Sequence, residues 1–170
     1  MAERYGRVKL MNAYGTRDSG MRMPFYLEYR KGNGWVTNTD DSCTVLTGAH
    51  VAPGNPTTAN ADSSGITLAA AATVSPTRSG VGSVFLTRPS GVGWLNVALN
   101  LAGTVAVPDQ SCMTKTAAGG GAGLTYLRYG SPSDRRWSCP TGLGGSDPWA
   151  RATFGAARNA GQTIYQRENY

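Results

Sequence analysis

The chain has 170 residues, which suffices for one sizeable core, and we expect a single domain over residues 1–170. Charged residues make up 15% of it while glycine reaches 23 residues, a balance typical of strands and turns rather than of surface helices. The net charge of +6 makes polyanion binding a class to consider, but the arginines are scattered from Arg4 to Arg167 without a basic helix, arm or stripe. We therefore expect an all-β domain that binds no nucleic acid.

Period-two alternation of apolar and polar residues predicts a half-buried strand over residues 21–30. Lys31–Gly34 then supplies residues that tolerate positive φ, and Trp35–Thr37 resumes the extended pattern, so a hairpin is expected here. An earlier strand is predicted around Val8 and Leu10, closed by a turn over Asn12–Gly15. Residues 47–64 are rich in Gly, Pro, Asn, Thr and Ser, which predicts a long exposed loop.

The next predicted strand begins at Ile66 and Leu68. Two further strands, over residues 81–87 and 92–101, are expected to pair through a turn at residues 88–91. A flexible connection is predicted over residues 108–123, because positions 117–123 are nearly all Gly and Ala.

The C-terminal part of the chain, residues 124–170, is predicted to add strands to a core formed by residues 4–107. A strand over residues 124–129 is followed by a loop over 130–148, and a last pair is expected between residues 150–154 and 163–167. About nine short strands indicate an all-β fold, an antiparallel β-sandwich with long Gly/Ser/Pro-rich loops, for which an immunoglobulin-like arrangement is one option.

The three cysteines are widely spaced and lack a CxxC pair, which argues against a zinc site. Cys112 and Cys139 both lie in loop-like sequence, where a disulfide would cross-link a segment with little core of its own, and we predict that bridge. Cys43 is then free, buried or paired with upstream sequence. No apolar run reaches the roughly 18–20 residues of a membrane span, and no signal peptide precedes Arg4. We interpret the chain as a C-terminal fragment of a longer exported precursor.

Reactive groups are sparse. The single histidine, His50, lies in loop-like sequence without a nucleophile elbow, so we expect a solvent-facing side chain and no enzyme. Asp40 and Asp41 are weak candidates for Ca²⁺, because the acidic spacing of a calcium loop is missing. A turn in which Asp side chains bond nearby backbone N–H groups explains them better. No cofactor is expected.

Aromatic side chains offer the best candidates for a binding surface. Trp35 and Trp94 fall within strand patterns and are expected to pack in the core. Trp137 and Trp149 lie in or beside the 130–148 loop, and together with the adjacent cations Arg135 and Arg136 they form the predicted binding residues.

Several strings are specific when they are taken together; they span residues 4–7 through 12–15, then 34–44, 147–148, 150–155 and 164–170. In these strings the chain resembles the C-terminal domain, of unknown function, of MshQ-like proteins, which are encoded with the mannose-sensitive haemagglutinin (MSHA) type IV pilus. The resemblance implies an exported modular protein that is secreted, at the cell surface or associated with the outer membrane. Its expected role is a non-catalytic structural or interaction module in pilus biogenesis or adhesion, with envelope or pilus proteins as partners.

A carbohydrate-binding adhesin module, with glycans as ligands, is the alternative. Aromatic faces present apolar surface to pyranose rings, which supports that reading of the tryptophans. A hydrolase is a minor third hypothesis. The chain has ten carboxylates, but the sequence alone does not bring any two of them to the separation that glycoside hydrolysis requires.

Overall fold

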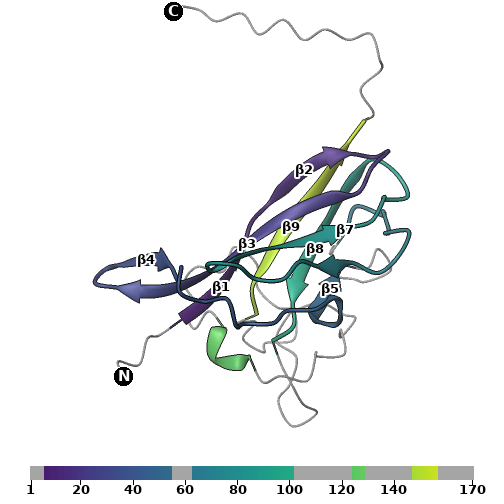
Figure 1. Ribbon diagram of the computed structural model, residues 1–170. Helices are drawn as coiled ribbons and strands as arrows, with labels where there is room; N and C mark the ends of the chain where they lie inside the picture. The colour runs from purple at the N-terminus through teal and green to yellow at the C-terminus, as the bar shows by residue number, and fades with distance from the viewer. Residues whose placement is uncertain (1–5, 55–62, 102–123, 129–146, 157–170) are drawn as a thin grey trace, which may run out of the picture.

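The computed structural model describes residues 6–54, 63–101, 124–128 and 147–156, which form two β-sheets packed face to face (Figure 1). This confirms the all-β sandwich. The elements are β1 (Gly6–Leu10), β2 (Ala13–Thr16), β3 (Met21–Lys31), β4 (Gly34–Thr37), η1 (Gly48–His50), β5 (Val51–Pro53), β6 (Thr73–Val74), β7 (Val81–Leu86), β8 (Gly93–Leu99), η2 (Thr125–Leu127) and β9 (Trp149–Gly155). Each of the two 3-10 helices has three residues, and no helix in the described parts of the chain has the length and hydropathy of a membrane span.

Sheet A has the strand order β1-β3-β7-β6, and β4 pairs with β3. The predicted strand and hairpin are confirmed, since β3 runs over eleven residues with alternating burial and turns into β4. The hairpin formed by β3 and β4 extends beyond the rest of the sheet (Figure 1). Pro24, which has no N–H, sits where β1 has ended, and its carbonyl accepts the N–H of Met11 at 3.0 Å. The missing donor faces the same edge of β3 as this carbonyl, and the pairing of β1 with β3 ends here.

Sheet B has the order β2-β9-β8-β5. All its pairs are antiparallel except β2 with β9, where Ala13 lies opposite Ala152 and the strands run parallel. Residues 12–15 were predicted as a turn, but 13–16 form β2. The turn prediction is wrong because Ala13 is buried against the core, which a turn at the surface would not require.

The core lies between the inner faces of the two sheets and holds the largest fully buried side chains. From sheet A these are Val8, Met23, Phe25, Leu27 and Val84, and from sheet B they are Leu95, Val97, Leu99 and Phe154. Gly82 lies opposite Phe25, and a Cβ on this glycine would overlap the phenyl ring. The aromatic ring thus occupies the space that a side chain on the facing strand would need.

Strands β7 and β8 exist as predicted, but they do not pair. β7 pairs with β3 and β6 in sheet A, whereas β8 pairs with β9 and β5 in sheet B, so residues 87–92 cross from one sheet to the other. Ile66 is buried near this crossing without forming a strand, and Leu68 makes one isolated bridge to Pro89. A hairpin and a crossover bury the same alternating residues, so the pattern could not separate them.

The predicted exposed loop at residues 47–64 is wrong in its first part, where η1 and β5 are packed against the sandwich. A Cβ on Gly48 would lie 2.5 Å from the carbonyl oxygen of Ala72, so a small residue is required by close packing rather than by exposure. Residues 55–62 lie outside the described part of the chain.

The strand predicted at residues 124–129 is instead the 3-10 turn η2. Leu124 and Leu127 are buried while Tyr126 is 63% exposed, a spacing of three that suits a 3-10 helix. Arg128 then donates from Nε to Asp147 Oδ1 at 2.8 Å; the Asp147 side chain is fully buried and that of Arg128 is 10% exposed. The same oxygen accepts the N–H of Leu101 at 3.3 Å. One carboxylate, just before β9, therefore connects η2 with the residues that follow β8.

Strand β9 confirms the prediction for residues 150–154, but the predicted pairing with residues 163–167 is wrong. Ala152 already pairs with Ala13 on one side and Leu95 on the other, so both edges of β9 are occupied. Residues 163–167 themselves, like the connection at 108–123, lie outside the described residues.

A candidate binding face on sheet B

The outer face of sheet B collects aromatic and polar side chains. Successive side chains alternate between faces, and because Leu95 and Val97 point into the core, Trp94 and Asn96 point outward. The register extends this face across three strands: Trp94 lies opposite Thr153, which in turn pairs with Tyr14. We call the set the aromatic face; its members are Tyr14, Trp94, Asn96, Trp149, Arg151 and Thr153.

Arg151 organises the centre of the aromatic face. Its Nε donates to Asn96 Oδ1 at 3.0 Å, and its guanidinium carbon lies 3.9 Å from the centroid of the Trp94 ring. Asn96 is 1% exposed, so this bond satisfies an amide oxygen that would otherwise be buried without a partner. The backbone N–H of Arg151 donates to Asn12 Oδ1 at 2.8 Å, which extends the contact between β9 and the chain before β2.

The two ends of the aromatic face differ in exposure. Trp149 is half-buried and packs on Ala52 and Ala98, whose small side chains leave room for the indole. Tyr14 is 79% exposed. Two strand spacings separate Tyr14 from Trp94, a distance of about 10 Å between backbones. The face thus combines one freely exposed tyrosine with half-buried indoles on paired strands. Side chains held on strands are well suited to recognition of another molecule.

The sequence identified one member of this face, Trp149, and missed the others. Trp94 was predicted to lie in the core, but it is half-buried on the outer face beneath Arg151. Trp35 was predicted likewise, and it stacks under Arg7 at 4.0 Å on the outer face of sheet A. The alternation around Leu95 contained the signal that Trp94 points outward.

The other predicted binding residues, Arg135, Arg136 and Trp137, lie outside the described residues. So do Cys112 and Cys139, and their predicted disulfide remains a prediction. Cys43 is exposed and carries a free thiol.

Asp40 and Asp41 lie in a turn after β4. The Asp41 carboxylate accepts the N–H groups of Cys43 at 3.1 Å and Thr44 at 2.9 Å, and the Thr44 hydroxyl at 2.8 Å. This confirms the predicted side-chain-capped turn at Asp41. Both aspartates line an open pocket of about 580 Å³ together with Asn38 and Tyr126. Within the described ranges, no three His, Cys, Asp or Glu side chains gather as metal ligands.

His50 is 2% exposed, so the prediction of a solvent-facing side chain is wrong. Its Nδ1 accepts the backbone N–H of Thr47 at 3.0 Å, which leaves the ring proton of the neutral form on Nε2. Burial lowers the pKa of His50, because it penalises the charged imidazolium. A neutral histidine that closes a 3-10 turn serves the local fold.

The fold gathers cations that are scattered in the sequence. Strands of sheet A carry five basic residues and one acidic residue, namely Arg7, Lys9, Arg22, Arg30, Lys31 and Glu28. The strands of sheet B carry one charged residue, Arg151. Strand pairing therefore brings basic residues of β1 and β3, which are separated in the sequence, onto one sheet.

A family model described as DUF6701, fourth domain, matches residues 4–169. The chain matches no curated protein and no solved structure. The family match agrees with the expectation of a domain of unknown function, and it carries no link to MshQ-like proteins or to pili.

Proposed function

We propose that this chain, which belongs to the DUF6701 family, is a non-catalytic interaction module that binds a protein partner through its aromatic face. The observation that carries the proposal is the exposure of Tyr14 beside Trp94, Arg151 and Trp149 on one rigid sheet. Tyr, Trp and Arg are the residue types that contribute most to protein–protein binding energy. Arg151 is the one charged residue on the strands of sheet B, and a low charge density suits the centre of an interface, where charged residues are depleted.

A non-catalytic role is supported by the state of His50. The protein's one histidine is buried and its Nδ1 is engaged by the backbone of Thr47, so it is poorly placed to act as a general base. The proposal that the domain is not an enzyme rests on this placement.

The resemblance to MshQ-like proteins supports a more specific version of the proposal. It suggests that the parent protein is exported to the cell surface or the outer membrane, and that the partner is an envelope or pilus protein. The test therefore uses purified pilin subunits of the MSHA type as the probe.

Binding of the purified domain to immobilised pilin is measured by surface plasmon resonance. Tyr14→Ala and Trp149→Ala are each expected to weaken binding about thirtyfold, because truncation of a hot-spot aromatic costs about 2 kcal/mol or more. Tyr126→Ala is the matched control, since this tyrosine is also exposed but lies on η2, away from the aromatic face. Unchanged binding in both face variants would overturn the proposed surface.

Carbohydrate binding is a second candidate function, and the aromatic face favours it through a specific feature. Indole and phenol rings share the outer face of sheet B with hydrogen-bond donors, including the Arg151 guanidinium. Pyranose rings stack on such aromatic faces, while their hydroxyls require polar partners. A glycan array with the same variants separates the two functions: glycan binding lost in Tyr14→Ala and Trp149→Ala, without pilin binding, would favour the adhesin module.

A further inference from the structure

We propose that the outer face of sheet A is a second binding surface, for an acidic polysaccharide whose carboxylates are separated by uncharged sugar units. This basic face consists of Lys9, Arg22 and Arg30 with the aromatic side chains of Tyr26, Trp35 and Phe85. It lies on the opposite side of the sandwich from the aromatic face, and it binds a different class of ligand. The proposal is therefore independent of the proposed function.

Strand register places these residues on one surface. Phe25 and Leu27 point into the core, so their neighbours on β3, Arg22, Tyr26 and Arg30, belong to the outer face. Lys9 pairs with Tyr26, Arg30 pairs with Trp35, and Arg22 pairs with Phe85. Each cation on this face thus has an aromatic residue as its cross-strand neighbour.

The face keeps a positive charge after its internal contacts are counted. Glu28 is held by Arg7, with Arg7 Nε and Nη2 each 2.6 Å from Glu28 Oε2, and this pair is neutral as a unit. Arg22 donates to the Ser83 hydroxyl and Arg30 to the Gly32 carbonyl, which are uncharged acceptors. Within the described residues, neither arginine nor Lys9 forms an ion pair with a carboxylate. These three charges are available to an anionic ligand.

The spacing of the charges selects the class of polyanion. Arg22, Tyr26 and Arg30 are four residues apart along β3, and Lys9 lies opposite Tyr26, so neighbouring cations are separated by about 14 Å. A nucleic-acid strand presents one phosphate about every 3.4 Å, and most of its charges would have no partner here. An anionic membrane attracts dense clusters of Lys and Arg. Sparse cations match a chain whose negative charges are sparse.

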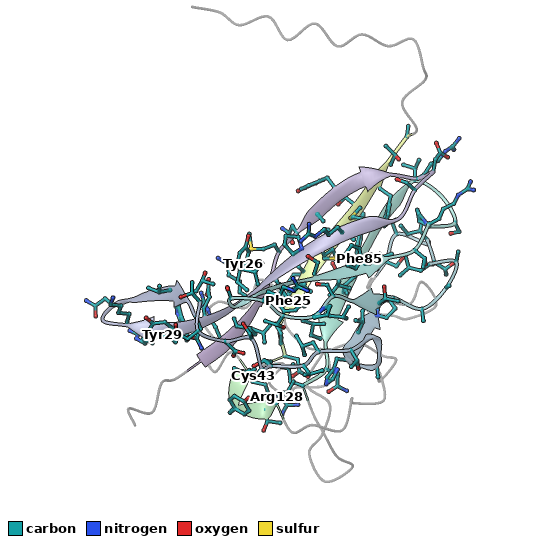
Figure 2. All side chains as sticks on the ribbon, in the orientation of Figure 1. Phe25, Tyr26, Tyr29, Cys43, Phe85 and Arg128 are labelled. Carbon is teal, nitrogen blue, oxygen red and sulfur yellow. The ribbon has the colours of Figure 1, made fainter. Side chains whose placement is uncertain are left out.

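The aromatic residues between the cations supply contact area for uncharged sugar rings. Phe85 is 42% exposed and Tyr26 is half-buried, on the neighbouring strands β7 and β3 (Figure 2). Trp35 is half-buried beside Arg30, under the guanidinium of Arg7. A ligand with alternating charged and neutral units would meet cations and ring faces in turn.

The test measures binding of the whole chain to hyaluronate, which carries one carboxylate in each disaccharide, by isothermal titration calorimetry. The double variant Lys9→Gln/Arg30→Gln is expected to bind about tenfold more weakly, because it removes two of the three ionic contacts with the polysaccharide. The matched control is Arg17→Gln/Arg88→Gln, which removes the same charge from exposed arginines near Asp18, in the segments before β3 and after β7.

Retained binding in the control, with loss in the basic-face variant, supports the proposal. It is overturned if hyaluronate does not bind, or if both double variants lose the same affinity, because net charge alone would then explain binding. It is also overturned if single-stranded poly(dT) or phosphatidylserine vesicles bind more tightly than hyaluronate. Tyr14→Ala serves as a cross-check: it is expected to leave hyaluronate binding unchanged, whatever the result for pilin.

Discussion

Arg151→Ala tests whether the contacts of Arg151 stabilise the aromatic face. The substitution removes the bond from Nε to Asn96 Oδ1 and the stacking on Trp94. A hydrogen bond from a charged group to a buried partner contributes about 1.5–3 kcal/mol, and an exposed cation–π contact contributes about 0.5–1 kcal/mol. Water can reach the space vacated by this exposed side chain, so we expect the lower end, a loss of about 2 kcal/mol in the free energy of unfolding.

Urea denaturation followed by tryptophan fluorescence measures this loss. With a slope of about 2 kcal/mol per molar urea, the midpoint is expected to fall by about 1 M. Arg151→Lys keeps the positive charge but lacks the planar guanidinium, and about half of the loss is expected to remain. This conservative variant separates the geometry of the contact from its charge.

A double-mutant cycle with Asn96→Ala measures how much of the loss comes from the hydrogen bond between Arg151 and Asn96. Without the buried amide, Arg151→Ala is expected to cost only its cation–π contribution, about 0.5–1 kcal/mol, so the coupling energy is about 1–1.5 kcal/mol. A loss below about 0.5 kcal/mol in the single variant would refute the argument. So would an Arg151→Ala loss that is the same with and without Asn96, since the residues would then not be coupled.

Three further predictions concern the fold that supports both faces. Gly82→Ala is expected to lower the free energy of unfolding by about 1–3 kcal/mol, because the new methyl group overlaps the phenyl ring of Phe25. Gly34→Ala is the control: Gly34 has open space around it, and the same urea assay should show a change of less than about 0.5 kcal/mol. Asp147→Ala leaves Arg128 buried without its carboxylate, and a loss of about 3–5 kcal/mol is expected by calorimetry; a loss under about 1 kcal/mol would contradict the buried pair. Because the pKa of His50 is lowered in the folded state, its contribution to stability is fully present above pH 6.5 and is lost as pH falls through the folded pKa. Denaturation at pH 7 and 5 should therefore show a smaller pH dependence in His50→Gln, and an unchanged dependence would exclude this cause.

Elements with a clear period of two were predictable from the sequence. β3 and the hairpin into β4 follow from alternation that ends at a glycine turn, and β9 follows from alternation around Phe154. Crossovers were not predictable, because alternation specifies which side chains are buried and not which strand is the neighbour. Small residues were also ambiguous in the sequence. Gly48 was interpreted as part of an exposed loop, but its small size allows the chain to pack closely on Ala72.

The binding faces were predictable only in part. Trp149 was identified as a surface residue, but Tyr14 was assigned to a turn and Trp94 to the core. The three come together because β2 pairs with β9 and β9 pairs with β8, and those pairs involve residues from opposite ends of the chain. Lys9 likewise joins Arg22 and Arg30 on one face only after β1 has paired with β3.

The central place of β9 in sheet B determines the order in which the domain can fold. The bond from Arg151 to Asn12 closes a span of 139 residues, whereas the β3–β4 hairpin needs only local contacts. Sheet A can therefore begin to form early, while β2 and β8 keep unpaired edges until the last described strand arrives between them. During synthesis these edges stay open to pairing with other chains, so the domain is most prone to aggregation just before β9 is available.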